Sequence, residues 1–145
     1  MGYYTQYKLS KTDLRSEMYE NLKNKEISEV NASTISEEIK TSLIELIENK
    51  YSIKPITIRM VIEAMGEVPN AWWNPFNGAP QKWYQHEKDM IKVSEKYPDI
   101  VWILDGIGEE GFDVWRKYFY NGKIQRANTS VVYDEFDQNK LMSLN

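Results

Sequence analysis

The fold of this chain is decided by residues 99–127, DIVWILDGIGEEGFDVWRKYFYNGKIQRA. Asp99–Asp105 is a short, nearly continuous apolar run, which is typical of a buried strand. The side chains of Phe112–Tyr120 alternate between two faces, as they do along a strand. Asn121–Gly122 follows, the pair preferred in two-residue hairpin turns because both residues tolerate positive φ. Lys123–Ala127 is then the returning strand, and the segment predicts a three-stranded antiparallel meander.

A sheet of this kind needs a helical layer over one face. Residues 83–97 have apolar side chains at helical spacing, and Pro98 stops the pattern. Residues 34–49 carry a clear apolar stripe, and Thr34 with Glu37 fits the capping-box pattern of a helix start. We therefore expect two helices, over 83–97 and 34–49, to lie side by side on the sheet.

The remaining segments are shorter. We expect a first strand over residues 3–9, a short helix over about 14–25 and a polar loop over 24–33. Residues 56–65 predict a third helix, although the run is equally β-like, and residues 131–136 predict a further strand. The fold class is thus α+β: an antiparallel meander with an N-terminal strand, packed on two or three helices.

A length of 145 residues corresponds to about one ordinary domain. We expect a single α+β domain over 1–145, with a helical and tryptophan-rich insertion at about 10–82. Because the chain has no cysteine, it has no disulfide framework, thiolate nucleophile or zinc finger. Its one histidine, His86, excludes multi-histidine metal sites. Neither a metal nor another cofactor is expected, and no complete catalytic constellation is apparent.

The formal net charge is −4 at pH 7. The first sixty residues contain nine basic and nine acidic side chains, whereas the remainder contain nine and thirteen, so the acidic excess falls after residue 60. Only four arginines are present, and no run of cations, so we expect no sequence-specific DNA binding. Apolar runs are too short for a membrane span. The first residues lack a basic region followed by an apolar core, which favours a cytoplasmic location in the host cell.

Gly106–Gly111 spells G-x-G-x-x-G directly after a predicted strand. A dinucleotide site would need a helix next, with the pyrophosphate near the glycine amides. Here Glu109 and Glu110 would place like charge beside the phosphates, and a strand follows instead. The motif therefore predicts a turn and not a nucleotide-binding loop.

Four carboxylates, Asp105, Glu109, Glu110 and Asp113, fall within nine residues with no basic residue between them. A solvated acidic turn explains them structurally. Hard-oxygen coordination of Ca²⁺ or Mg²⁺ and an acid/base pair are weaker alternatives, because the spacing matches neither pattern. The functional interpretation is a surface that meets lysines or arginines of a protein partner.

The loop over 66–82 is unusual because it contains Trp72, Trp73 and Phe76 among three prolines and two glycines. Aromatic side chains in such a loop either fold back into the core or form an exposed surface that anchors a partner. We keep both alternatives, with these three residues as candidate apolar anchors.

A small-ligand site is the alternative function. A nucleotide base would stack on Trp83 beside His86, and Arg116, Lys117 and Arg126 would supply cations for its phosphates. A small hydrolase that uses His86 is a weaker third hypothesis, because nothing in the sequence places a nucleophile near it.

Residues 83–125 resemble a segment of small uncharacterised proteins of phages and mobile elements. The shared pattern is an aromatic pair, His-Glu, Asp-Met, Tyr-Pro-Asp, an apolar strand, Gly-x-Gly-Glu-Glu, then Asp-x-Trp, Tyr-Phe and Gly-Lys, all present here in that order. This chain departs from it in the turn, where Ile107 and Phe112 stand in a stretch that is more acidic in the family. Residues 10–82 lie outside the shared pattern.

That resemblance carries no activity. Combined with the small size, the acidic balance and the two loops, it leads us to expect a non-catalytic, phage-type accessory protein. Its partner would be a host protein or ribonucleoprotein, and inhibition of a host defence system, in the manner of an anti-CRISPR protein, is the role that we expect. The sequence leaves the oligomeric state open.

Overall fold

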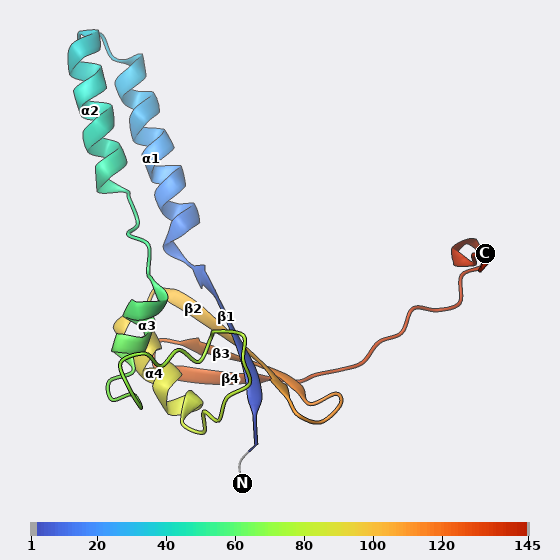
Figure 1. Cartoon of the computed structure of the whole chain (residues 1–145). Coiled ribbons are helices and arrows are strands. Elements are labelled where there is room, and N and C mark those ends of the chain that lie inside the picture. The colour runs from blue at the N-terminus through green and yellow to red at the C-terminus, as the bar shows by residue number, and fades with distance from the viewer. Residues whose placement is uncertain (1–2, 145) are drawn as a thin grey trace.

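The computed structural model describes residues 3–144. Its strands and helices, in chain order, are β1 (Thr5–Asp13), α1 (Arg15–Ala32), α2 (Glu37–Lys50), α3 (Ile58–Ala64), α4 (His86–Lys96), β2 (Ile100–Gly108), β3 (Val114–Tyr120) and β4 (Lys123–Ala127), followed by a 3₁₀ turn, Gln138–Lys140. Figure 1 shows a sheet, a pair of projecting helices and an extended C-terminal tail. The predicted α+β class is confirmed.

The four strands form one antiparallel sheet in the order β1-β2-β3-β4. β1 runs beside β2 over its whole length, from Thr5 opposite Gly108 to Asp13 opposite Ile100. Asn121 and Gly122 join β3 to β4 with φ of 48° and 76°, the left-handed conformation that the Asn-Gly pair predicts. The predicted meander with an N-terminal strand is therefore confirmed, although β1 continues through residues 10–13, which were expected to precede a helix.

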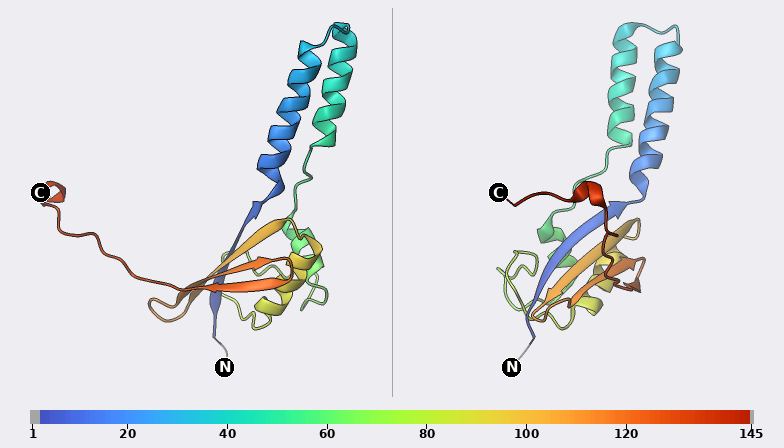
Figure 2. Two further views of the ribbon diagram at one scale, coloured as in Figure 1. Left: turned by 180° about the vertical axis from the view of Figure 1, so that it is seen from behind. Right: turned by 90° about the vertical axis from the view of Figure 1, so that its right-hand side faces the viewer.

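One face of the sheet is covered and carries the core. The short helices α3 and α4 lie on this face, together with the loop that joins them (Figures 1 and 2). The buried apolar side chains come from both layers and include Tyr7, Val61, Met65, Met90, Val93, Ile100, Trp102, Leu104 and Phe119. The helices over 56–65 and 83–97 are confirmed with slightly shorter bounds.

The expectation that the 34–49 helix lies beside α4 is wrong. α2 instead pairs with α1 in an antiparallel hairpin that projects from the sheet (Figure 2). The place on the sheet is occupied by α3, whose Val61 and Met65 fill the core. Neither α1 nor α2 contains a buried residue. Of the insertion expected over 10–82, the α1–α2 hairpin stands apart, whereas α3 and parts of the following loop contribute to the core.

The loop expected over 24–33 is also wrong, because α1 continues to Ala32. Contacts with α2 stabilise these turns: Glu26 accepts hydrogen bonds from Lys50 at 3.1 Å and from the Tyr51 hydroxyl at 2.7 Å. The cap of α2 is Ser36 instead of Thr34, since the Ser36 Oγ accepts from the Ile39 amide.

The strand expected over 131–136 does not form. After Ala127 the chain leaves the sheet and runs away from it as an extended tail (Figures 1 and 2). A strand requires a neighbour for its backbone groups, and the tail has none beside it. The Thr129 hydroxyl, which donates to the Val114 carbonyl at 3.1 Å, holds the beginning of the tail to β3.

Between residues 3 and 144, no helix combines the length and apolar character that crossing a bilayer requires.

Candidate functional site

The acidic segment after β2 is a structured loop and not a set of free carboxylates. Asp105 lies within β2, directly opposite Arg116, and the two side chains form a bidentate pair at 2.7 and 2.9 Å. The pair raises the pKa of Arg116 through the hydrogen bonds to Asp105. Asp105 is thus neutralised on the face of the sheet opposite α4.

The other acidic residues connect the loop to Tyr3 and Tyr4, which directly precede β1. The Tyr3 hydroxyl donates to the Asp113 carboxylate and accepts from the Glu110 amide, and Glu109 Oε1 accepts from the Tyr4 amide at 2.9 Å. The bond to Asp113 raises the pKa of the Tyr3 hydroxyl. These bonds span more than a hundred residues of sequence, and they order the β2–β3 loop.

The ordered loop presents Phe112 at its tip. Phe112 is 81% exposed, and its φ of 64° lies in the left-handed region that L residues rarely adopt. Such a backbone persists only where its surroundings impose it, and such residues cluster at functional positions. Ile107, Tyr4 and Tyr84 are exposed, and all lie at this end of the sheet: Ile107 is opposite Gln6 in β1, and the Tyr84 hydroxyl accepts from the Tyr3 amide at 3.0 Å. We define the tip surface as Tyr4, Tyr84, Ile107, Glu109, Glu110 and Phe112.

The three predicted aromatic anchors do not form one exposed surface. Trp72 is 93% exposed, whereas Trp73 and Phe76 pack edge-on against Trp83, each with ring centroids 5.5 Å away. Both alternatives for the 66–82 loop therefore hold in part: two rings serve the core and one faces solvent. Trp72 borders a cleft of about 510 Å³ beside Arg59, whose guanidinium donates to the Ala71 carbonyl at 2.8 Å.

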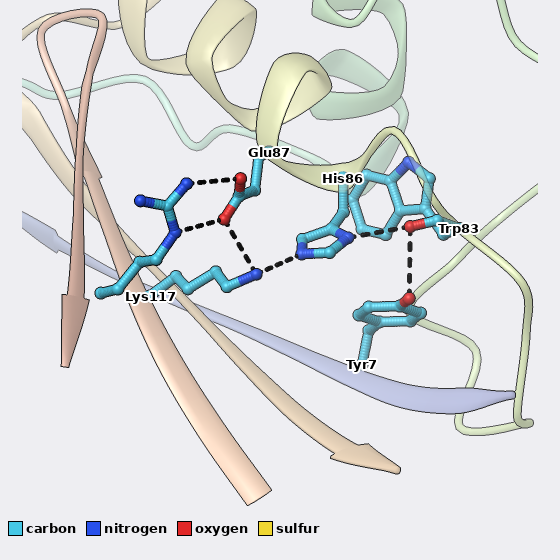
Figure 3. A network of polar contacts seen from close by, with 6 residues as sticks. Tyr7, Trp83, His86, Glu87 and Lys117 are labelled. Atoms are coloured by element: carbon cyan, nitrogen blue, oxygen red, sulfur yellow. Dashed lines mark hydrogen bonds and ion pairs between the residues drawn. The ribbon is translucent and has the colours of Figure 1, made fainter. Parts of the chain in front are cut away.

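Most residues of the alternative ligand site meet in a polar network between α4 and the sheet (Figure 3). The His86 Nδ1 lies 2.9 Å from the Trp83 carbonyl oxygen, which can only accept, so Nδ1 carries the proton. Nε2 then accepts from the Lys117 ammonium at 2.6 Å. Lys117 also forms an ion pair with Glu87 at 3.0 Å, and Arg126 donates two hydrogen bonds of 2.8 Å to the Glu87 carboxylate.

The network sets the protonation of its members. Burial lowers the pKa of His86 from its ordinary 6.5, and the neighbouring Lys117 cation adds to this effect. The Arg126 guanidinium lowers the pKa of Glu87 to about 2, assisted by Lys117. At neutral pH the arrangement therefore holds a neutral imidazole, one carboxylate and two cations.

These contacts connect α4 to the sheet, and they leave few polar groups or aromatic faces free to bind a ligand. Trp83 is only 4% exposed and is enclosed by Tyr7, Trp73 and Phe76, so a base cannot stack on it. Both nitrogens of His86 are engaged, and Glu87 occupies the cations of Lys117 and Arg126. Arg116 lies on the opposite face with Asp105.

The glycine motif has a packing explanation. Gly106 and Gly108 lie within β2, where a Cβ on Gly106 would stand 2.1 Å from the Trp115 ring and one on Gly108 equally close to the Asp113 carboxylate. Strand β3 follows the loop instead of a helix, so the phosphate-binding geometry is not formed. Among residues 3–144, no group of three or more acidic or histidine side chains is placed to hold a metal ion.

Sequence reasoning missed the residues that make the tip surface apolar. Phe112 and Ile107 stood out only as departures from a more acidic pattern, and an aromatic residue next to a turn glycine was the available signal. Tyr4 and Tyr84 carried no signal, because only the fold brings them to the β2–β3 loop.

Comparison with protein-family models, with curated proteins and with solved structures finds no match to this chain.

Proposed function

We propose that the chain is a non-catalytic accessory protein that binds a host macromolecule through the tip surface. The observation that carries the proposal is Phe112, an 81% exposed aromatic side chain held in a left-handed conformation by an ordered loop. A loop that is already ordered loses little conformational entropy on binding, which favours affinity.

The chemistry of the tip surface indicates the partner. Phe112 and Ile107 are its apolar part, and Glu109 and Glu110 are its charged edge. An apolar pocket bordered by lysines or arginines would complement both features. Host proteins that handle nucleic acid carry such basic surfaces, so a protein component of a defence ribonucleoprotein is the partner class that we propose, with inhibition as the outcome.

Capture from host lysate by the immobilised full-length protein tests the contact surface. Phe112→Ala should reduce capture of the specific partner at least about thirtyfold, because truncation of a hot-spot residue costs about 2 kcal/mol or more. Trp72→Ala is the matched comparison, an aromatic residue of the 66–82 loop that is also highly exposed, and it should leave capture unchanged. Loss with Trp72→Ala alone would assign the contact to the 66–82 loop.

The acidic edge is tested by salt and by charge removal. Joint replacement of Glu109 and Glu110 by Gln should weaken capture severalfold at low ionic strength and much less at high salt. Glu37→Gln with Glu38→Gln, the exposed acid pair that begins α2, is the control. Equal losses from both pairs would mean that only overall charge matters.

The inhibitory role has its own readout. Expression of the protein in bacteria that each carry one defence system should restore plating of a restricted phage in one of them, and Phe112→Ala should abolish that restoration. Absence of any effect in every strain, with the partner still captured, would refute inhibition while leaving the binding function intact.

A further inference from the structure

The outer edge of β1 is open to a further strand. The Thr5 amide and carbonyl point away from β2 and bond to Gln81, both at 2.9 Å, which is an isolated bridge. Because β1 pairs with β2 in unbroken register, the backbone groups of Tyr7, Leu9 and Lys11 face the same outward side. In the described part of the chain no strand covers them.

A cleft lies along this open edge. It has a volume of about 490 Å³, and its walls include Leu9 of β1, Ile58 at the start of α3 and Phe76 of the 66–82 loop. An added strand places alternate side chains on one face, and those on the covered face would enter this cleft. The edge thus offers both backbone bonds and an apolar site.

The C-terminal tail has the matching chemistry. Residues 129–133, TSVVY, are rich in residues that favour strands, yet Val131, Val132 and Tyr133 are 58%, 85% and 80% exposed. Asp134, Glu135 and Asp137 follow, whereas β1 presents Lys8 and Lys11. The tail thus offers an apolar stretch followed by acids, and the outer edge of β1 offers an apolar cleft with two lysines, so the two are chemically complementary.

We propose that residues 129–137 of one copy add as a fifth strand to the open edge of β1 in a second copy. Exchange within one copy is disfavoured, because the tail leaves from β4, at the opposite edge of the sheet, and runs away from β1 (Figure 2). Three strand spacings, about 14 Å, and the β2–β3 loop separate the two edges. Reciprocal exchange closes a symmetric dimer in which both tails and both outer edges of β1 are paired. This proposal is independent of the tip surface.

The mass of the full-length protein in solution is the first test. Light scattering should give twice the 17.2 kDa of one chain at micromolar concentration. Joint replacement of Val131 and Val132 by Asp should give a monomer with an unchanged circular dichroism spectrum. Leu46→Asp, an exposed leucine of α2, is the control that should stay dimeric. A monomeric wild type, or a dimer broken only by Leu46→Asp, would overturn the proposal.

The edge itself is tested at Lys11. Lys11→Pro removes the outward amide without touching a bond to β2, and proline is tolerated at such edge positions. It should weaken dimerisation about fivefold or more relative to Lys11→Ala, which keeps the amide. Equal dissociation constants for the two variants would show that β1 is not the docking edge.

Cross-linking tests which chain donates the tail strand. Because the protein has no native cysteine, only the introduced cysteines can react. A mixture of Lys8→Cys protein and Ser130→Cys protein, treated with a short bismaleimide, should give a product that contains one chain of each kind. The double variant at high dilution should give little product within one chain. Cross-linking only within single chains would replace exchange by docking of the tail on its own sheet, and cross-linking in neither would exclude the tail as the occupant.

Discussion

The sheet body, comprising β1–β4 with α3, α4 and their connecting loop, and the α1–α2 hairpin are both built from amphipathic elements, but only the body encloses a core. Trp102, Leu104 and Phe119 of the body are at most 1% exposed. In the hairpin Ile39 and Leu46 are 53% and 64% exposed, and its helices meet through half-buried side chains. An apolar stripe on a helix therefore shows only that the helix can bury apolar surface. How much it stabilises the protein depends on which element packs against the stripe.

The largest effect is expected in the body. Phe119→Ala removes a fully buried ring between the sheet and α4, and should lower the free energy of unfolding by about 3–5 kcal/mol. Urea denaturation followed by tryptophan fluorescence measures this. A loss below about 1 kcal/mol would mean that the body is no better packed than the hairpin.

Adding a side-chain atom to the packed sheet should lower the free energy of unfolding somewhat less than removing the Phe119 ring. Gly106→Ala would place a Cβ 2.1 Å from the Trp115 ring, and the displacement of that ring should destabilise the protein by about 1–3 kcal/mol. Gly111→Ala is the control, since a Cβ there meets no atom within 4 Å. Equal stabilities of the two variants in the same denaturation experiment would contradict the packing of β2 against Trp115.

Acid should destabilise the body in two steps. Since the folded pKa of His86 lies below 6.5, the unfolded chain takes up that proton first, and stability falls as the pH drops below 6.5. Glu87, with a pKa of about 2 against an ordinary 4.5, contributes stability above 4.5 that is lost between 4.5 and 2. In unfolding free energies measured from pH 7.5 to 3, His86→Gln should remove the first step. Glu87→Gln should reduce the second, to which Asp13 and Glu26 also contribute because their pKa values are lowered by their partners. Identical profiles for wild type and both variants would argue against the network in Figure 3.

The smallest effect is expected in the hairpin. Ile44→Ala truncates a half-buried side chain of α2 and should cost less than about 1 kcal/mol, whereas Ile100→Ala in the body should cost about 2–5 kcal/mol. Amide hydrogen exchange should likewise be faster in α1 and α2 than in β2 and β3. Comparable losses for the two substitutions would show that the hairpin is covered in solution.

Features that depend on residues close in the sequence were predicted correctly, whereas features that depend on distant contacts were not. The β2–β3–β4 meander was predictable because alternation along each strand and the Asn121–Gly122 turn are local. The position of α2 was not, since its stripe fits the sheet and another helix equally well. Ser36 replaced Thr34 as the cap for a related reason: several neighbouring residues are competent caps, and the local pattern does not distinguish between them.

For the candidate site, the sequence located the acidic loop but not what its carboxylates do. Asp105 is neutralised by Arg116 in the neighbouring strand, and Asp113 is held by Tyr3, 110 residues away. The tip surface depends on these contacts, so no local pattern could identify it. The aromatic side chains of the 66–82 loop likewise fall into a buried and an exposed group. Proximity to Trp83, and not composition, decides which rings are buried.

By itself, the sequence determined the α+β class, the meander and its turn, and the concentration of acids and tryptophans after residue 60. Only the tertiary structure decided that α3 covers the sheet in place of α2, that Phe112 is presented at an ordered tip, and that within residues 3–144 no strand lies beside the outer edge of β1 or beside the tail. The physical reason is that periodicity and turn chemistry act between residues close in sequence, whereas burial and charge pairing depend on which distant surfaces meet.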